Sequence, residues 1–257
     1  MPQRMRIARI LFALGMMSVG VLTLVLGYQV LLFLPVPPAW IPWLKPIGYA
    51  SGVIMVGTGA GLVFERSAPV ATRILLPFLL VWTLSRVPVV ILDPGREISW
   101  FAVGEIAVLA AGAMVLFTTL AKLSAGSTLQ RVTREHGLRT ARLLFALSLP
   151  TFGLSHFFEF AARTVSLVPA WLPYRTEWAY LTGAAQIAAG LGVLFSIYPR
   201  LAASMEATML SVFTLLVWVP AVAANPRLPS NWGEFIFTFA LAGASWVVAE
   251  SIPGKHF

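Results

Sequence analysis

The chain has 257 residues, of which 58% are hydrophobic and only 11% are charged, and its mean hydropathy is +0.84. Soluble domains carry about 25% charged residues, so a soluble fold cannot hide this much apolar surface and a lipid bilayer must be the solvent. The sequence contains no cysteine, which excludes disulfides, iron–sulfur clusters and c-type haem attachment.

Apolar stretches follow one another along the whole chain, and each meets or nearly meets the roughly 20 residues that cross a bilayer as a helix. In chain order they cover residues 7–33, 44–64, 68–92, 98–120, 139–166, 176–197, 200–224 and 231–250. None shows the period-two alternation of a barrel strand. The sequence therefore predicts an all-α polytopic membrane protein with eight transmembrane helices.

The first stretch has the appearance of a signal peptide, because Arg4, Arg6 and Arg9 precede an apolar run. Its apolar run is longer than the roughly 7–15 residues of a signal peptide. The same pattern also returns as the fifth stretch, within the chain. We therefore expect a retained helix.

The two halves of the chain repeat each other, with offsets of 131 to 133 positions. The matching segments are 8–14 with 141–147, 38–42 with 169–173, and 59–64 with 190–195. This predicts one four-helix repeat over residues 5–121, a basic cytoplasmic linker over 122–138, and a second repeat over 139–251. Because each repeat has an even number of spans, both enter the membrane in the same orientation.

The net charge of +8 is distributed as in a membrane protein rather than a nucleic-acid-binding protein. With eight spans, twelve Lys and Arg residues fall on the side of the termini and six on the other. Six of the nine tryptophans fall at the opposite ends of the spans, as an interfacial belt does. We expect a bacterial-type inner-membrane protein with cytoplasmic termini.

A proline-rich segment with a tryptophan follows the first span of each half, at Pro38–Pro42 and Pro169–Pro173. A turn anchored by Trp at headgroup depth is favoured over a lid that closes on a ligand. The second copy continues into Trp178–Gly183 and Ala189–Gly192, and Gly153–Phe157 precedes it. These motifs resemble the DoxX-like family of four-helix membrane proteins. The resemblance is strongest over residues 139–250, weaker over 5–120, and describes a tandem duplication.

The resemblance implies an accessory subunit of a quinone- or small-molecule-linked redox system, in contact with a soluble or membrane oxidoreductase. A quinone would then be the cofactor. Two alternatives remain open: a carrier or channel for a small solute, and a non-catalytic membrane scaffold. Whether the chain is an enzyme stays undecided at this point.

His156, Glu159 and Arg163 are spaced by three and four residues, which places them on one face of the predicted fifth helix. Ionisable groups inside a membrane indicate function by default. The corresponding part of the first half carries no charge, so the pattern predicts a ligand pocket in the second half only, open to the outer face. Glu234 is expected at similar depth, where it would face His156 or Arg163. An internally paired polar patch is the alternative, and a metal site is disfavoured because the ligand set is incomplete.

Arg86 and Glu105 lie about equally far from the turn at Asp93–Arg96. In an antiparallel hairpin this places them at the same depth, and we expect a structural ion pair. The glycines of Gly57–Gly61 sit within an apolar helix, so they indicate close helix packing rather than a nucleotide loop. Membrane haem commonly needs two intramembrane histidines, and only His156 is in a predicted span.

Overall fold

The structure is a computed structural model that describes residues 1–26, 41–121 and 128–253. The side chains of 41–43 and 128–133 are not described either. The proline-rich segment after the first helix, residues 122–127 of the predicted linker and the last four residues therefore lie outside the described part.

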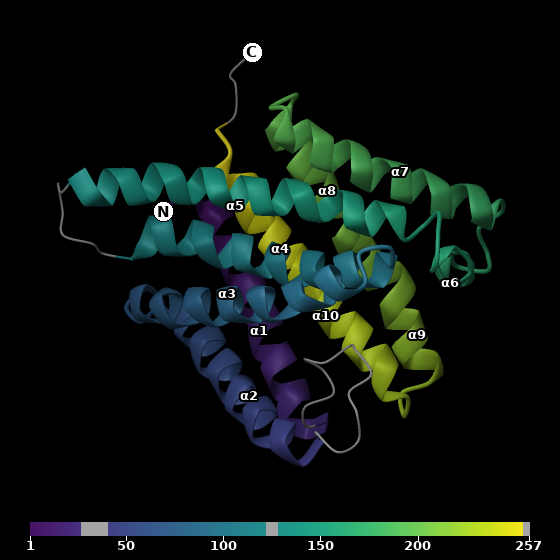
Figure 1. Ribbon diagram of the computed structural model, residues 1–257, viewed down its shortest axis with the longest axis horizontal. Helices are drawn as coiled ribbons and strands as arrows, with labels where there is room; N and C mark the ends of the chain where they lie inside the picture. The colour runs from purple at the N-terminus through teal and green to yellow at the C-terminus, as the bar shows by residue number, and fades with distance from the viewer. Residues whose placement is uncertain (27–40, 122–127, 254–257) are drawn as a thin grey trace.

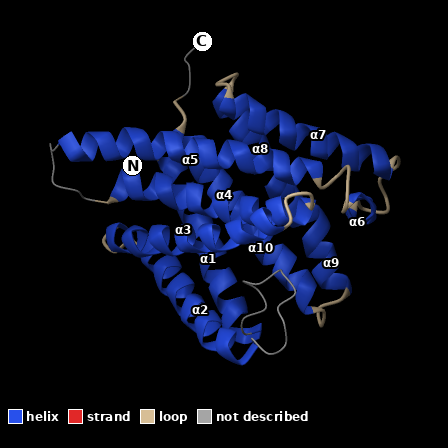
Figure 2. Ribbon diagram, in the orientation of Figure 1, coloured by secondary structure: helices blue, strands red, loops and turns tan. Residues whose placement is uncertain are grey.

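The described residues form helices and no strand, as Figure 2 shows. The first half contains α1 (Gln3–Leu26), α2 (Ile41–Val63), α3 (Ala68–Leu92) and α4 (Glu97–Leu120). The second half contains α5 (Thr128–Leu154), α6 (Ala161–Leu167), α7 (Arg175–Leu194), α8 (Pro199–Phe213), a π-helix η3 (Thr214–Trp218), α9 (Val219–Ala224) and α10 (Pro229–Ser251).

Six helical stretches are long and apolar enough to cross a membrane. They are residues 3–26, 44–63, 68–92, 97–120, 199–224 and 229–251. The prediction of helical structure with membrane-length helices is thus confirmed for the residues that the structure describes. Helices α5 and α7 are not among the six. The apolar part of α5 is short and follows Arg139 and Arg142, and α7 carries Glu177 and Gln186.

The predicted fifth span, residues 139–166, is wrong as a single helix. Helix α5 ends at Leu154, turns follow, and α6 begins at Ala161. Pro150 removes one backbone donor from the last turns of α5. The Ser155 hydroxyl then donates to the Phe152 carbonyl at 2.6 Å, a bond that competes with continued helical pairing. His156 and Glu159 therefore do not share a helical face.

Glycines bring α1 against α2 and α5 against α7 at backbone distance. A Cβ on Gly20 would lie 2.8 Å from the Gly52 carbonyl oxygen, and one on Gly153 would lie 2.4 Å from that of Gly183. These two contacts are related by the sequence offsets of the repeat. The same is true of Gly59 against Ala13 with Gly190 against Ala146, and of Gly61 against Ala71 with Gly192 against Ala202.

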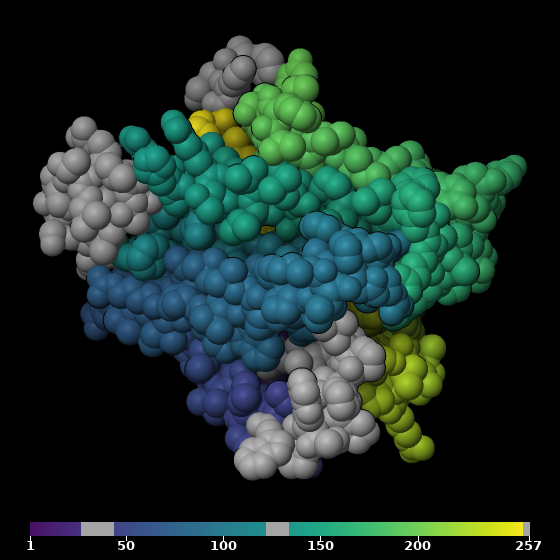
Figure 3. Space-filling view, in the orientation of Figure 1, coloured from purple at the N-terminus to yellow at the C-terminus, as the bar shows by residue number. Residues whose placement is uncertain are grey.

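Helix α10 lies at the centre of the molecule, where it packs against α1, α4 and α8. In Figure 1, α1 and α10 cross behind α3, α4 and α5. Gly112 of α4 meets Ala244 of α10, with a Cβ on the glycine 2.9 Å from that of the alanine. Figure 3 shows α5 lying directly against the hairpin of α3 and α4. The two halves therefore meet along this contact.

The turns that lead into α4 and α10 are built alike. The Trp100 indole donates to the Pro94 carbonyl at 2.9 Å, and the Trp232 indole donates to the Pro226 carbonyl at the same distance. Each tryptophan fixes the turn that precedes its helix. The α3–α4 turn, held in this way, positions the charged residues described below.

We predict that Gly20→Ala destabilises the protein by about 1–3 kcal/mol, because the added methyl group meets the α2 backbone. Gly57→Ala is the matched control, since no atom lies within 4 Å of a Cβ there. It should be neutral or stabilising by up to about 1 kcal/mol, because alanine favours the helix. Thermal unfolding in detergent measures both, and equal midpoints would contradict the packing role of Gly20.

Candidate functional site

The turn between α3 and α4 is clamped to the segment that follows α5. Arg96 Nη2 donates to Glu159 Oε1 at 2.5 Å, and the Glu159 backbone N–H donates to Glu97 Oε2 at 2.9 Å. The hydrogen bond and the charge of Glu159 raise the pKa of the Arg96 guanidinium above its ordinary value. Glu159 therefore pairs with the first half of the chain rather than with His156.

A second ion pair joins Arg163 and Glu234, with 2.6 Å between Nη2 and Oε1. The buried Glu105 carboxyl interacts electrostatically with both of them and with Arg86. Two residues that the sequence placed in the first half thus form one cluster with two from the second. Glu234 faces Arg163, one of the two partners that the sequence analysis considered for it.

Arg86 and Glu105 are both buried, with 4% and 9% of their surface exposed. Their charges attract each other. The negative charge of Glu234, by contrast, repels that of Glu105. The expected isolated pair is therefore part of a four-residue cluster with two carboxyl and two guanidinium groups, whose formal charges balance.

His156 is 7% exposed and packed against α7. Its Nδ1 lies 2.7 Å from the Ala179 carbonyl oxygen and 3.2 Å from the Thr182 hydroxyl. A carbonyl only accepts, so Nδ1 carries the ring proton. The neighbouring Phe157 ring stacks on Tyr180 with 5.3 Å between centroids. These contacts fasten the turn after α5 to α7, and His156 does not line the two cavities described below.

An open groove of about 470 Å³ lies between the α3–α4 turn and the end of α5. Its lining residues are Gly95, Glu97, Trp100, Thr151, Leu154, Phe158 and Glu159. Trp100, Leu154 and Phe158 make its walls apolar. Glu97 Oε1 is buried and has no hydrogen-bond partner among the described residues. The groove thus combines an apolar cleft with a buried carboxylate oxygen that has no partner among the described residues, at the boundary between the two halves.

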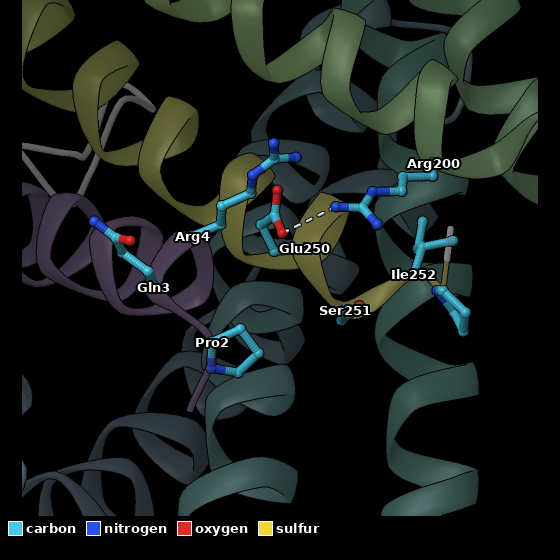
Figure 4. A pocket seen from close by; sticks show the side chains of 8 residues that line it. Pro2, Gln3, Arg4, Arg200, Glu250, Ser251 and Ile252 are labelled. Carbon is cyan, nitrogen blue, oxygen red and sulfur yellow. Dashed lines mark hydrogen bonds and ion pairs between the residues drawn. The ribbon is translucent and has the colours of Figure 1, made fainter. Parts of the chain in front are cut away.

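A second cavity, of about 550 Å³, lies where α1 begins and α10 ends. Figure 4 shows the Glu250 carboxylate between Arg4 and Arg200, and Arg200 Nη2 lies 3.1 Å from Glu250 Oε2. The charge of Arg200 is thus already matched by a carboxylate.

Arg96 and Glu97 were missed by the sequence analysis. An acidic residue in the first turn of a helix is ordinary, because it faces the positive end of the helix dipole. Nothing in the sequence showed that the segment after α5 would fold onto this turn. Among the described residues, no group of three or more His, Asp or Glu side chains could hold a metal ion.

Comparison with known proteins gives one match. The model of a family described as a domain of unknown function (DUF8561) matches residues 145–237, which run from α5 into α10. No curated protein matches the chain. No solved structure matches it either.

We predict that Arg86→Met or Glu105→Gln alone destabilises the protein by about 3–5 kcal/mol, because each leaves the buried cluster with unbalanced charge. The double variant should lose less than the two single losses added together. Thermal or denaturant unfolding in detergent measures the cycle, and strictly additive losses would contradict coupling.

The exposed pair formed by Arg96 and Glu159 is the control for this cycle. Their side chains are 56% and 39% exposed, so solvent screens the interaction. Arg96→Gln should change the unfolding midpoint much less than Arg86→Met does.

Proposed function

We propose that the chain forms two parallel four-helix repeats with eight membrane spans, in a tandem DoxX-like arrangement. The recurring glycine contacts support this proposal, because equivalent helices meet at equivalent positions in both halves. In this arrangement α5 and α7 supply the two spans beyond the six apolar stretches. The charge bias of the sequence supports cytoplasmic termini in an inner membrane.

We further propose that the protein is an accessory membrane subunit of a quinone- or small-molecule-linked redox system. The observation that supports it is the groove beside Glu97: its walls are apolar, and the buried Glu97 Oε1 lacks a partner among the described residues, so an amphipathic ring whose hydroxyl displaces the surrounding side chains would suit it. The groove lies at the end of the spans that the charge bias places outside. A quinol headgroup has this chemistry and reaches such a site from the lipid.

In this proposal the residues in and around the groove have separate roles in binding. Trp100 and Phe158 would cover the faces of the ring and exclude water. Glu97 Oε1 would accept the hydrogen bond of a hydroxyl group, and Arg96 with Glu159 would hold the two walls together. Electrons would pass to a partner oxidoreductase, so the subunit binds and positions rather than reacts.

A non-catalytic scaffold is the second candidate function. The closed surroundings of His156 favour it, because this residue was the main sequence signal for a reactive site. The scaffold and the redox subunit differ in one respect that can be measured, which is ligand binding in the groove.

We predict that a short-chain quinol analogue binds the purified protein and that Glu97→Gln weakens binding about tenfold, since an amide oxygen accepts a weaker hydrogen bond than a carboxylate does. Glu65→Gln is the matched control, because Glu65 is 64% exposed at the other end of the spans. His156→Phe should leave the affinity unchanged and lower the unfolding midpoint. Isothermal titration measures the affinities, and absence of binding to the wild type would support the scaffold instead.

We predict that a cysteine at Gly95 reacts with a membrane-impermeant maleimide from outside the cell, whereas one at Arg66 reacts only after permeabilisation. Both positions lie in turns: a Cβ at Gly95 would meet no atom within 4 Å, and Arg66 is exposed. The chain has no cysteine of its own, so only the introduced one can react. Labelling in the reverse pattern would overturn the proposed orientation.

A further inference from the structure

A carboxyl and an amide are buried together in the second half of the chain. Glu206 of α8 has 0% of its surface exposed, and Gln186 of α7 has 3%. Gln186 Nε2 donates to Glu206 Oε1 over 3.4 Å. Glu206 lies seven residues beyond Pro199, about 10 Å along α8 from its start. An acid at this depth is surrounded by protein rather than by water.

The corresponding positions of the first half are apolar. At the repeat offset of 131, Gln186 matches Met55 and Glu206 matches Leu75, which are 1% and 0% exposed. The flanking contacts of glycine with alanine follow the same offset, so the match is one of structure as well as of sequence. A well-packed apolar pair therefore suffices for the fold at this place. The polar pair of the second half needs another explanation.

Two oxygens of the pair have no partner among the described residues. They are Glu206 Oε2 and Gln186 Oε1. An ionised carboxylate with one long hydrogen bond is strongly disfavoured in such surroundings. If Glu206 Oε2 carries a proton, it becomes a donor, and the amide oxygen is the acceptor that it lacks. An acid and an amide then form a cyclic pair with two hydrogen bonds, and one proton satisfies both oxygens.

Among the residues that the structure describes, no other ionisable group neutralises Glu206. Burial and the Gln186 amide are the influences that act on it. Arg200 of α8 pairs with Glu250 of α10, and Glu234 of α10 pairs with Arg163. The remaining titratable or charged groups on the helices packed against Glu206 are Arg175, Glu177 and Tyr180 of α7. No ion pair between these groups and Glu206 is present in the described structure.

We propose that Glu206 and Gln186 form a proton-binding site within the membrane, present in the second half only and occupied at neutral pH. Loss of the proton leaves a buried charge and breaks the cyclic pair, so α7 and α8 would be held together less firmly. Helix α8 continues into the π-helix η3 eight residues beyond Glu206. Such wide turns are frequent at functional sites and give the helix a place to adjust. The site thus couples protonation to the packing of α8.

Infrared difference spectroscopy of the purified protein in lipid tests the proposal. At pH 7, wild type minus Glu206→Gln should show the carbonyl stretch of one protonated carboxylic acid per chain. Gln186→Met should keep this band but shift it to higher frequency, because the acid loses its acceptor. Glu65→Gln is the control and should remove only carboxylate bands.

Two results would overturn the proposal. The first is a Glu206→Gln difference spectrum at pH 7 that contains carboxylate bands in place of the acid band. The second is loss of the wild-type acid band on adding sodium but not potassium, which would identify a cation site. If Glu206→Gln does not fold, the double variant Gln186→Met with Glu206→Leu replaces it, because it installs the apolar pair of the first half. This variant should fold, lack the band and unfold at or above the wild-type midpoint.

Discussion

Close backbone contact through glycine is the constraint on which this structure depends. Lipid tails are as apolar as leucine, so helices in a membrane gain little from hydrophobic burial against each other and need close packing. Gly20 with Gly52, and Gly153 with Gly183, let one helix approach another until carbonyl oxygens meet the neighbouring chain. Because both halves use these contacts at matching positions, each half builds a similar helix pair.

This arrangement also explains why charged residues gather near the α3–α4 hairpin and the beginning of α10. Helix α10 packs between α1 and α4, which brings the beginning of α10 close to the α3–α4 hairpin. Glu105 and Glu234 would repel each other there without Arg86 and Arg163. The four groups therefore work as one unit that joins the halves. The groove beside Glu97 lies next to this junction, and Glu97 Oε1 has no partner among the described residues because Arg96 bonds to Glu159 instead.

The two halves also differ at buried positions where an apolar pair suffices for the fold. Leu75 and Met55 fill the first half, whereas Glu206 and Gln186 occupy the same places in the second. His156 also belongs to the second half, but it bonds to a backbone carbonyl and stabilises the end of α5 against α7. Buried polar groups in one copy of the repeat are thus of two kinds: His156 is satisfied by the surrounding backbone, whereas the pair of Glu206 and Gln186 needs a bound proton to satisfy its oxygens.

The sequence by itself determined the membrane class, the helical content and the positions that repeat, because these depend on composition and local spacing. It also predicted that Arg86 and Glu105 lie at one depth, since equal distance from a turn is a local property. Only the tertiary structure decided which partners the polar and charged side chains of the second half bond to. Because helix α5 ends at Leu154, Glu159 accepts a hydrogen bond from Arg96, and His156 donates one to the Ala179 carbonyl. Glu97 and Glu206 each have a buried oxygen without a hydrogen-bond partner among the described residues. This results from packing between segments far apart in the chain, and no local pattern encodes such contacts.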